Sequence, residues 1–65
     1  DLDAVKLQRA ILSLPTKQQL AFNLRYYNDL GYDEIAAIIG STADGVKSSY
    51  HIAKDKIVKY MNANN

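Results

Sequence analysis

The sequence predicts an all-α fold, a small domain of four helices. Apolar residues recur three or four positions apart along the whole chain, which is the period of a helix packed on one side. No segment shows the alternation expected of a strand. Pro15, Gly31 and Gly40 divide the chain into segments of helical length, and the last segment is the longest.

The first helix is expected from about Leu2 to Ser13, with Lys6 and Arg9 facing water. Its apolar side consists of Leu7, Ala10, Ile11 and Leu14. Pro15 ends this helix, because the residue before a proline is pushed out of helical geometry. The same proline suits the first turn of the second helix, "PTKQQLAFNLRYYND", where its missing N–H is no loss. The residues of the second helix expected to face the core are Leu20, Ala21, Leu24 and Tyr27.

The third helix, "YDEIAAIIG", is short, and Gly40 ends it. Asp33 and Glu34 lie in its first turn, where the helix dipole favours negative charge. Its inward residues are expected to be Ile35, Ile38 and Ile39. The fourth helix begins at Ser41-Thr42, with Thr42 as the N-cap, and continues to about Asn62. Its apolar stripe is formed by Val46, Tyr50, Ala53, Ile57 and Tyr60/Met61.

Composition excludes several classes of function. The chain has 65 residues, which makes one domain (residues 1–65), and 48% of them are hydrophobic, enough for a core. It has no Cys and one His, so we expect no disulfide, no metal site and no cofactor. No nucleophile–base pair and no glycine-rich phosphate loop are present, so we predict that it is not an enzyme. No apolar run approaches the roughly 20 residues of a membrane span, so we expect no membrane partner and a cytoplasmic setting.

The third and fourth helices together have the layout of a helix-turn-helix. Asp44, Lys47, Ser48 and His51 fall at i, i+3, i+4 and i+7, which lines one side of the fourth helix with hydrogen-bonding groups. In this motif the second helix enters the major groove, with its N-terminal residues at the base edges. Residues 1–40 carry four cations and five acids, a net of −1, and residues 41–65 carry four lysines and two aspartates, a net of +2. Positive charge is therefore concentrated on the predicted reading helix.

The order and spacing of several short segments resemble region 4 of bacterial RNA polymerase sigma factors, particularly the extracytoplasmic-function type. The segments are "LP" with a following glutamine, "LRYY", "LGYDEIA", "IIG" and "GVKSSYHIAK", and the resemblance covers nearly the whole chain. It implies a four-helix module that binds the upstream, minus-thirty-five promoter element through its last helix. It also implies docking on the β flap of RNA polymerase and, in many cases, inhibition by an anti-sigma factor.

This sequence departs from the family pattern at positions that bear on DNA binding. Gly45 replaces the usual threonine, Ser49 stands where arginine is usual, and Ile52 stands where a basic residue is frequent. Gly31 takes the place of the usual N-cap serine. With few basic groups, binding by the isolated domain is expected to be weak and steeply dependent on salt.

The candidate DNA-binding residues are Arg25, Ser41, Thr42, Ala43, Asp44, Lys47, Ser48 and His51. Lys47 can bind a phosphate or a guanine base. The alternative is that it is an ordinary surface lysine that contacts only water. Asp44 can accept from cytosine N4 or simply favour the helix dipole. Arg25 can reach the DNA backbone or pair with Asp29 four residues on. The helical spacing of the five tyrosines favours core and rim packing over base stacking.

The predicted partners are therefore promoter DNA and the RNA polymerase core and, as in many members of the family it resembles, an anti-sigma factor, with the domain itself a monomer. Because the chain carries no promoter-melting segment, we expect it to be a piece of a longer protein. Two alternatives remain open from the sequence. One is the output domain of a response regulator, which shares "EIA", "IG" and "VK". The other is a helical protein-interaction module that does not bind DNA, which the missing arginines favour.

Overall fold

The computed structural model describes residues 1–63, and all regular structure in that range is helical. The helices are α1 (Leu2–Leu12), α2 (Thr16–Tyr26), α3 (Tyr32–Ile39) and α4 (Ala43–Ala63). Their order and bounds match the sequence prediction to within a few residues at each end. The all-α, four-helix fold class is thereby confirmed.

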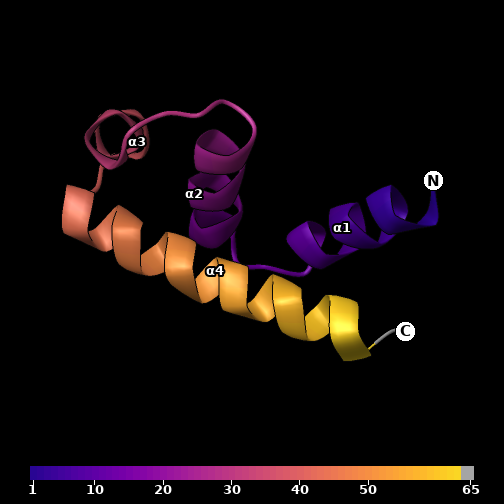
Figure 1. The fold of residues 1–65 in the computed structure, drawn as a ribbon. Helices are drawn as coiled ribbons and strands as arrows, with labels where there is room; N and C mark the ends of the chain where they lie inside the picture. Colours follow the sequence, from indigo (N-terminus) through magenta and orange to yellow (C-terminus); the bar gives the residue numbers. More distant parts are fainter. Residues whose placement is uncertain (64–65) are drawn as a thin grey trace.

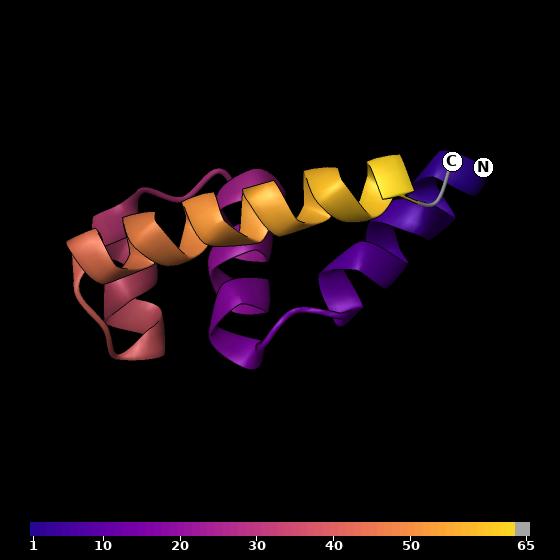
Figure 2. The same ribbon diagram turned by 90° about the horizontal axis from the view of Figure 1, so that it is seen from below.

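The long helix α4 runs the length of the domain, and the other three helices pack along one side of it (Figures 1 and 2). α2 crosses α4 at a steep angle near its middle, with α3 beside the N-terminal end of α4 and α1 beside its C-terminal end (Figure 1). The resulting domain measures 35 × 19 × 15 Å. The side of α4 that faces away from the three shorter helices is left bare.

Local hydrogen bonds fix the ends of the first helix and the break after it. The Asp1 carboxylate accepts from the Asp3 N–H at 3.2 Å and caps the start of α1. At the other end, the Gln19 side-chain amide donates to the Leu14 carbonyl at 2.7 Å, which ties the break before Pro15 to the first turns of α2. The predicted break at Pro15 is therefore bridged by a hydrogen bond from α2 to the residue before the proline.

The core-facing side of α2 differs from the sequence prediction. Phe22 is only 4% exposed and Ala21 is fully buried, whereas Leu20 is 41% and Tyr27 52% exposed. The expectation that Leu20 and Tyr27 face the core was wrong. The segment "LAFNLRYY" is apolar on nearly all sides, so two overlapping helical stripes fit it equally well. Contacts with α1 and α4 select the stripe that contains Phe22.

A similar correction applies to the short helix α3. Ile35 is fully buried and Ile39 half-buried, as predicted, but Ile38 is 61% exposed. Ala36 is buried instead, so the inward side is centred between Ile35 and Ala36 and leaves Ile38 outside. Gly40 ends α3 with φ 70°, a left-handed conformation that suits glycine, as the sequence predicted.

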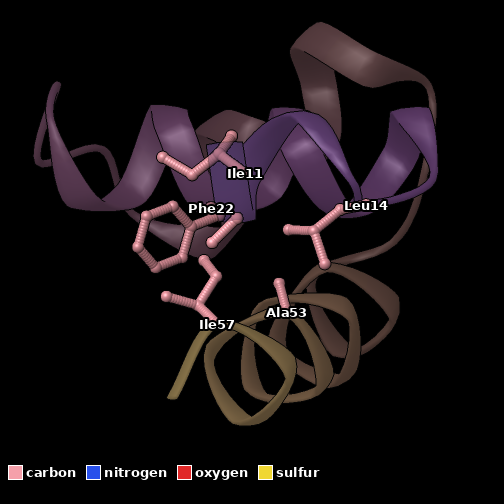
Figure 3. Packing of buried hydrophobic residues seen from close by; sticks show 6 residues of the cluster. Ile11, Leu14, Phe22, Ala53 and Ile57 are labelled. Atoms are coloured by element: carbon pink, nitrogen blue, oxygen red, sulfur yellow. The ribbon is translucent and has the colours of Figure 1, made fainter. Parts of the chain in front are cut away.

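Two apolar clusters hold the helices to α4. One joins α1, α2 and α4 and is built from Ala10, Ile11, Leu14, Phe22, Ala53 and Ile57; five of these are labelled in Figure 3. The other joins α2, α3 and α4 and is built from Ala21, Ile35, Ala36 and Val46. Tyr50 packs against both clusters, so the predicted stripe of α4 is confirmed as the continuous floor of the core.

No helix among residues 1–63 is both long and apolar enough to cross a membrane. In the same part of the chain, no group of three or more His, Cys, Asp or Glu side chains is arranged to hold a metal ion.

Candidate nucleic-acid interface

The start of α4 is fixed by hydrogen bonds that begin in the turn before it. The Ser41 N–H donates to the Ala36 carbonyl at 2.9 Å, which closes the turn around Gly40. The Thr42 Oγ1 then accepts from the Gly45 N–H at 3.0 Å, and the Thr42 carbonyl accepts from the Val46 N–H at 2.9 Å. Thr42 is thus the N-cap that the sequence predicted, and it fixes the direction in which α4 leaves α3.

The first turns of α4 have one buried and one exposed side. Val46 is fully buried on the inner side. Asp44, Lys47, Ser48 and His51 are all exposed on the opposite side, and Ala43 is half-buried at its edge. The predicted polar face therefore exists on the outer side of α4, opposite the buried Val46. Its residues are placed together by the helical period alone, without help from another element.

The polar side chains on this face are not used to hold the fold together. Within residues 1–63, the side chains of Asp44, Lys47 and Ser48 make no hydrogen bond or ion pair, and that of His51 makes only an edge contact with the Tyr50 ring at 5.8 Å between centroids. A free acceptor, a free cation and a free hydroxyl are therefore presented on one helix end. Such a set can form hydrogen bonds to base edges and phosphates in a major groove.

Gly45 leaves space that two hydroxyl groups occupy. A Cβ atom at this position would lie 3.0 Å from both the Ser41 Oγ and the Thr42 Oγ1. The glycine that replaces the family's usual threonine thus lets these two oxygens gather beside the first amides of α4. Ser41 is half-buried and Thr42 is exposed, so both candidate residues lie at the tip of the helix as expected.

Arg25 lies on a different element, at the end of α2. Its Nη1 donates to the Leu30 carbonyl at 3.1 Å, and its guanidinium carbon lies 5.0 Å from the centre of the Tyr32 ring. Among the described residues the pairing with Asp29, one of the two alternatives for this side chain, does not form. Arg25 holds the loop between α2 and α3, and its remaining N–H groups stay available because a guanidinium has five.

The sequence did not predict an apolar groove beside the polar face. α1, α2 and α4 enclose a volume of about 190 Å³ that opens to solvent and is lined by Leu7, Phe22, Tyr26, Tyr50, Lys54, Ile57 and Val58. Phe22 stacks between Tyr26 and Tyr50, with centroid distances of 5.0 and 5.8 Å. These ring contacts agree with the prediction that the tyrosines pack in the core and at its rim. The sequence held one sign of this groove, because Val58 is an apolar residue outside the predicted stripe of α4; in the structure it is 49% exposed.

The comparisons with known proteins identify the family. The chain matches the family "Sigma-70, region 4" over residues 4–57, which is most of its length and includes all but the last turns of α4. Comparisons with curated proteins and with solved structures gave no match. The family match favours the sigma resemblance over a response-regulator output domain. The chain belongs to the sigma-70 region 4 family, a non-catalytic helical DNA-binding domain of transcription initiation.

Proposed function

We propose that this domain binds the upstream, minus-thirty-five promoter element by placing the first turns of α4 in the major groove. The observation that carries the proposal is the polar face of Asp44, Lys47, Ser48 and His51, which is exposed and free of hydrogen bonds or ion pairs within residues 1–63. A major groove about 12 Å wide admits one helix, and the N-terminal turns of that helix lie deepest. The base edges and the adjacent phosphates would then be in reach of Ser41, Thr42 and Ala43.

Arg25 is proposed as a contact to the DNA backbone from the end of α2. Leu30 and Tyr32 hold its guanidinium while leaving N–H groups for a phosphate. With few basic side chains, the isolated domain should bind weakly. Attachment to RNA polymerase would raise the local concentration of the domain at the promoter and so compensate for weak contacts.

Substitution of Lys47 tests the groove assignment. We expect Lys47→Ala to weaken binding to a promoter-sized duplex several-fold and to lower the slope of log affinity against log salt by about 1, because one phosphate or base contact is lost. The matched control is Lys56→Ala, which removes the same charge from an exposed position nine residues further along α4. Fluorescence anisotropy at a series of low salt concentrations measures both quantities.

If both variants bound DNA as the unmodified domain does, the groove assignment would be wrong. If no duplex bound at any salt concentration, the domain would be a protein-interaction module instead.

The groove between α1, α2 and α4 is proposed as the surface that meets a helix of the polymerase β flap. The groove is apolar, it is lined by a stacked aromatic pair, and α4 contributes to it through residues 50–58 rather than through its DNA-facing tip. A helix with a stripe of large apolar side chains would bury that stripe here. DNA and polymerase could then be held at the same time.

Val58→Glu tests this surface. We expect it to reduce binding to polymerase core at least tenfold, because a charge would be buried against an apolar helix, while DNA affinity falls only slightly from the added negative charge. Asn62→Glu is the control, since it adds the same charge one turn further along α4 and outside the groove lining. Pull-down or surface plasmon resonance with polymerase core measures the effect, and equal binding by both variants would refute the assignment.

A further inference from the structure

We infer that Asp44 sets the base preference of this domain by selecting cytosine at one position of the promoter element. The inference rests on the proposed function, because it requires α4 to lie in the major groove. Asp44 is exposed in the first turn of α4, on the same side as Lys47 and Ser48. In a helix that enters the groove by its N-terminus, first-turn side chains on the outer side are the ones nearest the base edges.

The structure removes one of the two local explanations for an acid at this position. Acidic side chains are common at helix starts because they accept hydrogen bonds from the free amides. Here the Thr42 Oγ1 already accepts from the Gly45 N–H at 3.0 Å, and the Asp44 carboxylate has no hydrogen-bond or ion-pair partner within residues 1–63. The only local explanation left for this acid is the attraction between its charge and the helix dipole. Asp44 is the one acid in the first turn of α4.

An unpaired acid on a DNA-facing surface carries a cost that has to be offset. A carboxylate repels the phosphates on both sides of the groove, so Asp44 lowers the affinity of the domain for DNA of arbitrary sequence. A carboxylate only accepts hydrogen bonds. In the major groove cytosine offers only the N4 amino group, whereas adenine sets an N7 acceptor beside its N6 amino group, and guanine and thymine present acceptors that would repel the carboxylate. Asp44 therefore acts as a filter that weakens binding to most sequences and spares those with a cytosine beneath it.

Lys47 extends the same recognition along the groove. It lies three residues after Asp44 on the same side of α4, so an acceptor and a cation follow one another by about one helical turn. A lysine in this place donates to guanine O6 and N7. The pair thus favours a site containing both cytosine and guanine over an A·T-only site.

The test selects duplexes from a pool with a randomised upstream hexamer, using the unmodified domain, Asp44→Asn and Asp44→Ala. We expect the unmodified domain to enrich cytosine at one position, with a loss of about tenfold in affinity when that base is changed. Asp44→Asn should shift the preference at that position to adenine, because an amide pairs with adenine N6 and N7. Asp44→Ala should lose the preference and bind unselected DNA more tightly.

Asp55→Asn is the matched control, since it removes the other α4 acid eleven residues further on and should leave base preference unchanged. Equal base preferences for the unmodified domain and both Asp44 variants would overturn the inference while leaving the proposed function intact. If the unmodified domain selected no duplex at all, the inference and the proposed function would fall together. Melting temperatures by circular dichroism confirm that each variant is folded.

Discussion

At the scale of single residues, Gly31 leaves one hydrogen bond of a helix cap unmade. It is the N-cap of α3, with φ −72° and ψ 160°, a conformation open to any residue. The Glu34 carboxylate accepts from its N–H at 3.0 Å, which is one half of a capping box. The other half requires a side-chain oxygen at residue 31 that glycine cannot supply.

We predict that Gly31→Ser stabilises the domain by about 0.5–1 kcal/mol. A serine hydroxyl can accept from the Glu34 N–H, and the unfolded chain loses freedom when a glycine is replaced. There is room for the side chain, because a Cβ atom would lie 3.4 Å from the Glu34 Oε1, an ordinary contact. Urea denaturation followed by circular dichroism measures the change. Gly31→Ala should be nearly neutral, and equal gains from both substitutions would show that capping contributes nothing.

At the scale of the helices, α4 serves as the floor of the core and as the proposed reading helix. Its inner residues, such as Val46, Ala53 and Ile57, are buried by the shorter helices, while the side chains of its first outer residues have no hydrogen-bond partner among residues 1–63. The period of 3.6 residues allows both roles in one helix. Because Val46 is fully buried, the polar face has a fixed orientation relative to the rest of the domain.

Helix ends and the stripe of α4 could be predicted because they depend on local chemistry. Pro15, Gly40 and Thr42 each act through the backbone within a few residues, and the structure confirms all three. The inward side of α2 could not be predicted, because packing against α1 and α4 decides between Leu20 and Phe22. The groove was missed for the same reason, since it joins residues as distant in sequence as Leu7 and Val58.

At the scale of the whole molecule, Phe22 joins the helices around the middle of α4. It belongs to the cluster of α1, α2 and α4 and stacks on Tyr50, which also packs against the cluster of α2, α3 and α4. A loss of packing at this ring should therefore weaken both apolar clusters and lower the stability of the whole domain. A chain of this size has a total stability of only about 3–10 kcal/mol.

We predict that Phe22→Leu lowers the free energy of unfolding by about 1–2 kcal/mol, because two stacked ring contacts and part of the buried surface are lost. Leu20→Ala is the control on the same helix and should cost less than about 1 kcal/mol, because Leu20 is 41% exposed. Chemical denaturation followed by circular dichroism gives both values. A larger loss for Leu20→Ala would mean that α2 faces the core with the other stripe.

The N-terminus and the last turn of α4 lie at the same end of the domain, opposite the first turn of α4 (Figures 1 and 2). The 21 residues of α4 separate its two ends by about 30 Å. A dye, an affinity handle or a neighbouring protein module joined at residue 1 would consequently sit well clear of a docked duplex. Such an attachment would follow the rotation of the complex without competing for the groove.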